Sequence, residues 1–252
     1  VPGKEEFDET LVYWRRRLDK HGVQVHLGTR PAAGDLAGFD EVVVATGVNP
    51  RIPDIPGIDH PKCVSYASVL SGKVRAGRRV VILGAGGIGF DVAEFLSSPP
   101  QDQAMDPRHF LAEWGVDPAN AQPGALTRPA DARLEREIVM VQRRPGRMGR
   151  GLGVSTGWVL RLQLAKRKVA QITGATYRRI DDAGVHISVG SEERILPADT
   201  VVICTGQESD RSLYDALLAR SVKAHLIGGA AEAAELDAMR AIDQGVRLAH
   251  AL

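Results

Sequence analysis

The stretch RRVVILGAGGIGFDVAEFL, residues 78–96, determines the fold class of this sequence. Its part RVVIL is an almost continuous apolar run of strand length, as found at the centre of a parallel sheet. Gly84, Gly86 and Gly89 follow with the spacing G-x-G-x-x-G, and Ala93 extends the pattern into an apolar helix face. In this motif the glycines permit a tight turn, a close pyrophosphate and close helix–strand packing. We predict a dinucleotide-binding turn with the pyrophosphate at the helix start; the alternative is a glycine-rich structural turn.

Composition narrows the class of protein. The 252 residues suit one large domain or two intertwined smaller ones, and 44 % hydrophobic with 25 % charged residues is ordinary for a globular core. A net charge of +1 favours neither nucleic acid nor an anionic membrane as a partner. No apolar run reaches the ~20 residues of a membrane span. Cys63 and Cys204 lie far apart, which fits a cytoplasmic protein without a dithiol centre or a four-cysteine cluster in this chain.

The strand that follows the glycine turn does not end in the acidic residue that the motif predicts for the ribose of the nucleotide. An acidic residue usually follows the glycine turn by about 20 positions. Here residues 97–124 form an excursion rich in Pro, Asp and Gln, which we interpret as an insertion with a short helix around HFLAEWG. The next strand, EIVMVQRRPG at 137–146, ends in Gln142, Arg143 and Arg144.

These arginines favour NADP(H) over NAD(H). An acid would accept a hydrogen bond from the ribose 2′-OH and repel a 2′-phosphate, whereas arginines donate forked, charge-assisted hydrogen bonds to that phosphate. Arg147 and Arg150 in the following loop add positive charge. The alternative is a solvated basic loop. Binding of nucleic acid by RRPGRMGR is a remote third interpretation, since no aromatic residues are interleaved with the charges.

The order of predicted elements repeats within the chain. In each copy a helix and a strand precede an excursion and then an acidic residue before an apolar strand that ends in Thr-Gly. The first copy has a helix at 7–18 closed by Gly22, a strand at 23–27 and a strand at 41–47. The second has a helix at 158–168, a strand at 169–180, a hairpin-like segment at 184–190 and a strand within 196–206. A glycine turn precedes only the second copy. We therefore expect that this chain is a fragment and that the equivalent turn of the first copy lay upstream of Val1. The alternative to a repeat is convergent α/β patterning.

The Thr-Gly ends mark further candidate sites, because ligands of doubly wound sheets lie outside the carboxyl ends of the strands. They are Ala45-Thr46-Gly47 and Thr205-Gly206, which could equally be simple turns. HLIGG at 225–229 then joins a short strand to a Gly228-Gly229 turn and a closing amphipathic helix. Backbone amides at that turn are candidates for contact with a flavin or its diphosphate.

Eight stretches together resemble the pyridine-nucleotide/FAD portion of the 2,4-dienoyl-CoA reductase family, flavoproteins with an Old Yellow Enzyme-like N-terminal barrel. The likeness covers essentially residues 1–252. The stretches are PGKEEF (2–7), ATGVNPR (45–51), IDHPK (58–62), LGAGGIGFD (83–91), EWG (113–115), GLGVSTGW (151–158), VVICTGQE (201–208) and HLIGG (225–229).

The resemblance implies the fold and the electron path. It implies an α/β fold in which a Rossmann-like NAD(P)-binding domain, residues 75–207, is inserted in a partial FAD-binding domain made of residues 1–74 and 208–252. NADPH would pass a hydride to FAD, and electrons would reach FMN in the barrel through a 4Fe-4S cluster to reduce an unsaturated acyl-CoA or related enoate. The barrel, its FMN and cluster sites and an FAD glycine turn are not in this sequence, and HLIGGAAEAAE has no acid before Glu232, so the FAD site is expected to be incomplete.

Hydride chemistry belongs to the cofactors, so no catalytic residue is assigned, and the seven histidines show no metal-like spacing. The competing function is a non-catalytic adenine-nucleotide-binding structural module. The candidate cofactor-binding residues are Gly84, Ala85, Gly86, Gly87, Ile88, Gly89, Gln142, Arg143, Arg144, Thr205, Gly206, Ala45, Thr46, Gly47, Arg51, Gly228 and Gly229.

Overall fold

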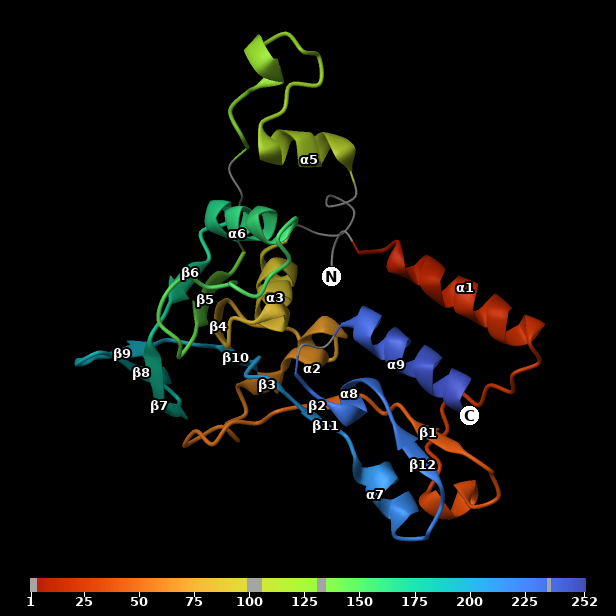
Figure 1. Cartoon of the computed structure of the whole chain (residues 1–252). Coiled ribbons are helices and arrows are strands. Elements are labelled where there is room, and N and C mark those ends of the chain that lie inside the picture. Colours follow the sequence, from red (N-terminus) through yellow and green to blue (C-terminus); the bar gives the residue numbers. More distant parts are fainter. Residues whose placement is uncertain (1–3, 99–105, 131–134, 235–236) are drawn as a thin grey trace. The chain divides into compact units, whose positions relative to one another are not determined.

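A computed structural model describes residues 4–98, 106–130, 135–234 and 237–252 (Figure 1). The chain divides into two compact units. Unit 1 combines Ile52–Thr205 with the chain up to Val12, and unit 2 combines Tyr13–Arg51 with Gly206–Leu252. No helix within the described residues is both long and apolar enough to span a bilayer.

Unit 1 is built on a five-stranded parallel sheet with the glycine-turn strand, β4, at its centre. Across the sheet the strands are β3 (Cys63–Ser65), β10 (Thr200–Ile203), β4 (Arg79–Leu83), β5 (Glu137–Val141) and β6 (Ala170–Ile172). The predicted strand–turn–helix is confirmed, because α3 (Gly87–Ser97) follows β4. Two more helices, α2 (Tyr66–Leu70) and α6 (Gly157–Lys166), belong to the same unit.

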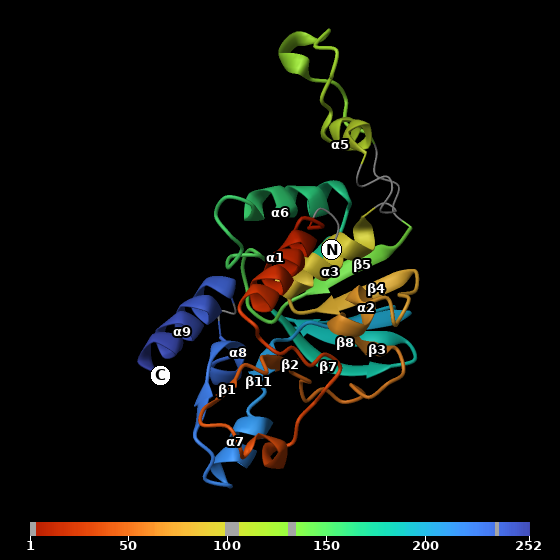
Figure 2. The ribbon, with the colours of Figure 1, turned by 90° about the vertical axis from the view of Figure 1, so that its right-hand side faces the viewer.

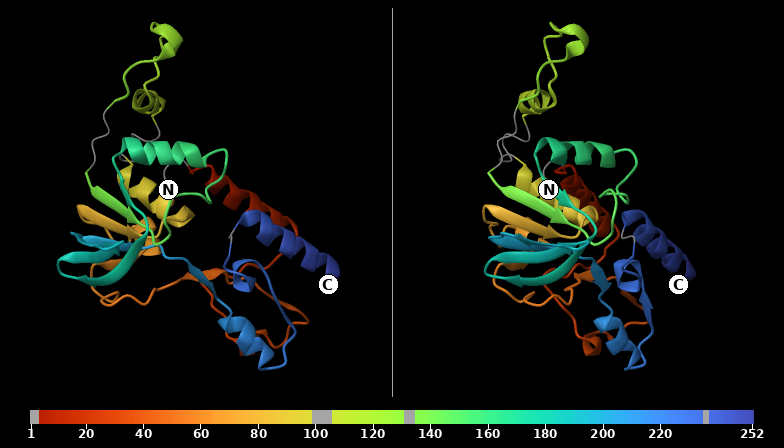
Figure 3. Two further views of the ribbon diagram at one scale, coloured as in Figure 1. Left: turned by 60° about the vertical axis from the view of Figure 1, so that its left-hand side comes forward. Right: turned by 90° about the vertical axis from the view of Figure 1, so that its left-hand side faces the viewer.

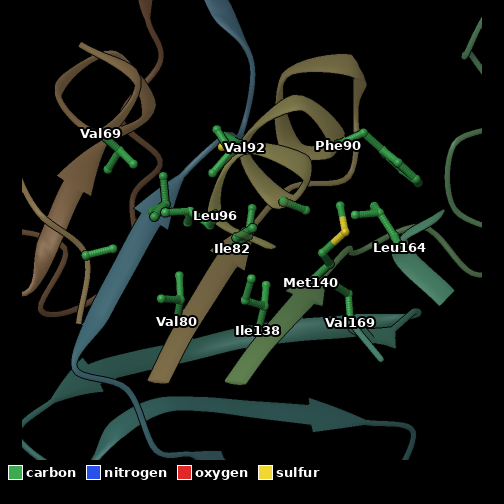
Figure 4. Close-up of a cluster of buried hydrophobic side chains, with 14 of the residues drawn as sticks. Val69, Val80, Ile82, Phe90, Val92, Leu96, Ile138, Met140, Leu164 and Val169 are labelled. Carbon is green, nitrogen blue, oxygen red and sulfur yellow. The ribbon is translucent and has the colours of Figure 1, made fainter. Parts of the chain in front are cut away.

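Both faces of this sheet are covered (Figure 3). On one face Ile82 of β4 and Met140 of β5 pack against α2, α3 and α6, whose Phe90 and Leu164 are fully buried (Figure 4). On the other face Val81 and its neighbours pack against an antiparallel meander. The meander is β7 (Ala175–Asp181), β8 (Gly184–Val189) and β9 (Glu192–Leu196). A strand buried on both faces reads as a continuous apolar run, which is why β4 lacks polar alternation.

Unit 2 contains two small sheets. Its strands are β1 (Val42–Val44) parallel to β12 (Ala224–Leu226), and β2 (Val48–Pro50) antiparallel to β11 (Gln207–Ser209). Its helices are η1 (Ala33–Leu36), α7 (Ser212–Leu218), α8 (Gly228–Ala231) and α9 (Ala238–Ala251), and α1 (Phe7–Lys20) crosses the unit boundary (Figure 2). The core of unit 2 consists of Ala33, Val42, Val44, Leu217 and Val222, against which partly buried residues such as Tyr214 pack. The predicted closing helix is confirmed as α9, and the helix closed by Gly22 is confirmed as α1.

Two predicted strands differ from the structure. Residues 23–27 form no strand, although Val23, Val25 and Leu27 alternate with polar residues. These three side chains are about half exposed or more, at 48, 51 and 83 %, and no strand within the described residues pairs with them. A strand exists only through hydrogen bonds to a partner, so the pattern alone is insufficient. The strand expected at 169–180 is divided into β6 and β7 at Gly174, whose φ of +69° breaks the extended backbone.

The predicted insertion helix is confirmed as α5 (Pro107–Trp114), followed by η2 (Pro123–Ala125). Residues 99–105 and 131–134 of the insertion lie outside the described residues. Arg167, which is 3 % exposed, fixes α5 by donating to Glu113 Oε1 from Nη2 over 3.0 Å and to Ser98 Oγ from Nη1 over 3.0 Å. A buried ion pair therefore connects α5 of the insertion to Arg167, the residue that follows α6.

The units do not divide where the resemblance placed the domain boundaries. β3 and α2 belong to unit 1, although residues 1–74 were assigned to the FAD-binding segment. The pairing of β3 with β10 explains this, because β3 is the edge strand of the sheet that carries the glycine turn. The assignment of segments 1–74, 75–207 and 208–252 to FAD and NADP(H) stays a prediction.

Candidate dinucleotide site

Gly84 and Gly89 are required by close packing of the turn. Gly84 has φ +106°, and a Cβ there would lie 2.1 Å from the carbonyl oxygen of Cys204. A Cβ on Gly89 would lie 2.2 Å from the carbonyl oxygen of Gly84. Backbone atoms cannot move aside as flexible side chains do, so any side chain at these positions displaces α3 from the sheet.

Gly86 and Gly87 have a different property, because a Cβ on either meets nothing within 4 Å. Gly86 is the N-cap of α3 with φ −79°, and no side chain caps the helix. The first amides of a helix have no acceptor within it and carry the positive end of its dipole. Open space above glycines and uncapped amides fit a diphosphate at this helix start.

The carboxyl ends of three strands meet beside this turn. Gly84 N donates to Val141 O at the end of β5 over 2.8 Å, and Cys204 N donates to Leu83 O over 2.8 Å. The structure therefore brings together the glycine turn, the segment from Gln142 onward and the segment through Thr205, which are separated by many residues in the sequence. Ala85 and Ile88 pack partly against the core beneath the turn.

The segment after β5, residues 143–150, is a cationic loop, which we call the arginine loop. Its sequence RRPGRMGR contains no acidic residue. Arg143, Arg144, Arg147 and Arg150 are exposed, and the structure records no hydrogen bond or ion pair for their guanidinium groups within its described residues. Uncompensated guanidinium groups beside a helix N-terminus form a favourable environment for an anion.

Tyr177, from β7 of the meander, is hydrogen-bonded to the same carbonyl group as the glycine turn. Its hydroxyl donates to Val141 O over 2.9 Å, the carbonyl that also accepts from Gly84 N. Burial raises the pKa of Tyr177 to about 12, so the phenol stays protonated as a hydrogen-bond donor at neutral pH. Sequence reasoning did not identify this residue, because only the packing of the meander on the sheet brings it to the turn.

Both cysteines are free, and burial raises the pKa of each thiol, that of Cys204 to about 12. A thiol whose pKa is raised in the folded state is harder to deprotonate there than in the unfolded chain, so folding loses stability as pH rises from about 9, its ordinary value, toward 12. We expect Cys204→Ala to reduce the slope of unfolding free energy against pH across this interval, as measured by urea denaturation. Cys63→Ala, at a less buried site, serves as the control and should change the slope less; equal slopes in wild type and Cys204→Ala would contradict the assignment.

The candidate residues of unit 2 lie in two places: at the carboxyl ends of β1 and β12, and beside the paired strands β2 and β11. The ends of β1 and β12 are joined by the hydrogen bond from Ile227 N to Val44 O over 3.2 Å, which places Ala45 beside the Gly228 turn. The Thr46 hydroxyl donates to Asp210 O over 2.6 Å. Arg51 N donates to Gly206 O over 3.0 Å, so these two candidates hold the paired β2 and β11 segments together.

The Gly228-Gly229 turn has contacts that sequence reasoning did not identify. Gly228 N donates to Gln244 Oε1 of α9 over 2.6 Å, and Gly229 O accepts from Ser209 Oγ over 2.7 Å. The Gly228 amide, expected to be available to a flavin or diphosphate, therefore already has an acceptor. No sequence signal linked Gln244 to this turn, because the two are 16 residues apart and meet only when α9 folds back.

A comparison with protein families identifies the family of this chain. The model of the pyridine nucleotide-disulphide oxidoreductases matches residues 17–223. The chain belongs to this family. The family implies FAD and NAD(P)H as cofactors, and the expected fold class, an α/β Rossmann-like domain within a two-dinucleotide flavoprotein architecture, is confirmed.

Curated relatives of this oxidoreductase are reductases and oxidases. A metal reductase of Desulforamulus reducens is 26 % identical over 244 residues, covering 91 % of this chain and 34 % of the relative. A cinnamate reductase of Clostridium sporogenes is 27 % identical over 234 residues, covering 91 % of this chain and 30 % of the relative. The chain thus spans about a third of the length of these relatives.

Solved structures share the fold. One is a complex of 2-naphthoyl-CoA reductase with 2-naphthoyl-CoA. The match covers 97 % of this chain and 32 % of the reductase chain, with a TM-score of 0.74 at 24 % identity. Histamine dehydrogenase from Rhizobium sp. 4-9 matches 100 % of this chain and 37 % of its own, with a TM-score of 0.71 at 16 % identity. The family match identifies the chain as a module of the pyridine-nucleotide-dependent flavoprotein oxidoreductases.

Proposed function

We propose that this module is specific for NADPH and passes its hydride to FAD within a longer protein that resembles 2,4-dienoyl-CoA reductase. The nucleotide preference rests on the arginine loop. This loop has four exposed arginines and no acidic residue, and it lies beside the uncapped start of α3. The α3 amides and Gly86 would hold the pyrophosphate, and Arg143 and Arg144 the 2′-phosphate. When bound, the nicotinamide supplies the hydride and the flavin accepts it.

The residues of unit 2 fit FAD only in part. Within the described residues β1 pairs with β12 alone, no strand of unit 2 leads into a G-x-G-x-x-G turn, and the Gly228 amide is bonded to Gln244. Ala45, Thr46, Gly47, Arg51, Gly206, Gly228 and Gly229 of this unit would line the flavin region of the longer protein, and Thr205 of unit 1 stays a separate candidate for cofactor binding.

We expect the purified 252-residue chain to carry little or no flavin. A diphosphate needs several convergent donors, and unit 2 supplies too few within its described residues. The measurement is the absorbance spectrum of the purified chain, followed by equilibrium dialysis with FAD. Stoichiometric FAD after purification would show that the described residues suffice and would overturn this part of the proposal.

The remainder of the electron path is proposed for the longer protein. FMN, a 4Fe-4S cluster and a barrel would receive the electrons and reduce an unsaturated acyl-CoA or related enoate, at a cytoplasmic location favoured by the two free thiols. The name of the cinnamate reductase supports an enoate substrate, while the metal reductase shows that relatives differ in what they reduce. The sequence motifs, rather than these names, favour the dienoyl-CoA class.

The competing function is a nucleotide-binding module without turnover. Anaerobic mixing of the longer protein with NADPH separates the two, since a reductase bleaches its flavin absorbance and a structural module does not. Bleaching by NADPH much faster than by NADH is expected. Unchanged flavin absorbance with bound NADPH would support the structural module instead.

A further inference from the structure

Gln142 immediately precedes the arginine loop, and its side chain is hydrogen-bonded to the backbone of that loop. We propose that Gln142 is a positioning residue that sets the nucleotide preference by holding the backbone of the arginine loop. The proposal rests on the proposed function of Arg143 and Arg144 as ligands of the 2′-phosphate.

The side-chain amide of Gln142 cross-links the loop. Its Nε2 donates to Arg144 O over 2.8 Å and to Gly146 O over 3.3 Å. Because both partners are carbonyl oxygens, the amide nitrogen must face them, and the orientation of the amide follows from the contacts. One side chain thus ties together the two ends of the segment Arg144–Gly146.

Gln142 is itself anchored at its backbone. Its N donates to Ile172 O over 2.9 Å, and its O accepts from Ala175 N over 3.1 Å. Gly174 N, between these two partners, donates to Arg144 O over 3.2 Å, so this carbonyl accepts two hydrogen bonds. The ends of β6 and β7 therefore hold one side of the loop, and the Gln142 side chain holds the other.

The arginine side chains depend on this support, because the structure records no hydrogen bond or ion pair of their guanidinium groups within its described residues. A loop held in its binding conformation loses less entropy when its ligand binds. The glycine turn has separate support: Gly84 bonds to Val141, Cys204 bonds to Leu83, and neither bond involves the Gln142 side chain. Loss of the Gln142 amide should therefore weaken contacts to the 2′-phosphate and leave those to the pyrophosphate intact.

The test is Gln142→Met, which keeps the length of the side chain and removes its donors. Calorimetric titration with NADPH and NADH should show roughly tenfold weaker NADPH binding, equal to about 1.4 kcal/mol, and unchanged NADH binding. Gln171→Met is the matched control, since Gln171 lies exposed on the adjacent strand β6. In an Arg143→Ala/Arg144→Ala background, Gln142→Met should have no further effect on the NADPH-to-NADH ratio, which a purely structural role would not predict.

Each other outcome has a distinct meaning. An unchanged ratio in folded Gln142→Met, or equal losses for both nucleotides, overturns the positioning role. If the double arginine variant itself retains the NADPH preference, the proposed phosphate site fails, whatever Gln142 does. Should Gln142→Met not fold by circular dichroism, Gln142→Asn retains a polar amide that is one methylene shorter and is expected to lower the ratio in the same direction; an unchanged ratio there also overturns the proposal.

Discussion

Replacing Arg143 and Arg144 together with alanine should weaken NADPH binding by tens-fold or more and leave NADH binding almost unchanged. Hydrogen bonds to charged groups contribute roughly 1.5–3 kcal/mol each before a discount for exposure. Two such bonds at the lower end give about 3 kcal/mol, which exposure of both side chains reduces to about 2 kcal/mol. Each 1.4 kcal/mol is about tenfold in affinity, so the loss is tens-fold. NADH has no phosphate at this position and should not respond. Calorimetric titration of both nucleotides measures the difference.

Salt and net charge supply the controls for this expectation. The preference of the wild type for NADPH should shrink as ionic strength rises, because screening weakens exposed charge pairs. Arg15→Ala/Arg16→Ala removes the same two charges from exposed positions on α1 and should leave both affinities unchanged. Equal losses for NADPH and NADH in the Arg143/Arg144 variant would mean that the arginines act on the shared pyrophosphate or on folding, and the NADP(H) preference would be wrong.

Gly86→Val should weaken NADPH and NADH alike, by roughly a hundredfold, equal to about 2.8 kcal/mol. The isopropyl group would occupy the space in which the pyrophosphate approaches the backbone. The fold should survive, because the position has φ −79° and nothing lies within 4 Å of an added Cβ. The measurements are nucleotide titration and thermal unfolding of the same protein sample.

Two other glycine substitutions make this result specific. Gly38→Val, also at a position with open space but in unit 2, should change neither affinity nor unfolding temperature. Gly89→Val should lower the unfolding temperature, since its Cβ would meet Gly84 O at 2.2 Å. Unchanged nucleotide affinity in folded Gly86→Val would move the dinucleotide site away from this turn.

Local chemistry was predictable wherever a feature depends on residues that are neighbours in the sequence. The strand, turn and helix from Arg79 to Ser97 follow from an apolar run, three spaced glycines and a helical apolar face. The cationic character of the loop after β5 follows from its composition, and the short helix expected around HFLAEWG is α5. The family assignment agrees with these local patterns.

The contacts that restrict each glycine required the tertiary structure. The sequence motif assigns the tight turn to Gly84, the close pyrophosphate to Gly86 and the helix packing to Gly89. The structure adds that Cys204 O restricts Gly84, that Gly84 O restricts Gly89 and that Gly86 faces open space. Likewise Thr46 and Gly228 were predicted from strand ends, and the structure shows that their polar groups bond to Asp210 and Gln244.

By itself the sequence determined that this chain has a glycine turn on a buried parallel strand and a cationic loop after the next strand of the sheet. Only the tertiary structure decided that residues 23–27 join no strand of the described chain, that Tyr177 supports the turn and that the Gln142 amide cross-links the arginine loop. The physical reason is the range of the interactions. Periodicity records which face of an element is apolar, whereas a hydrogen bond between distant segments exists only once the strands are ordered in a sheet.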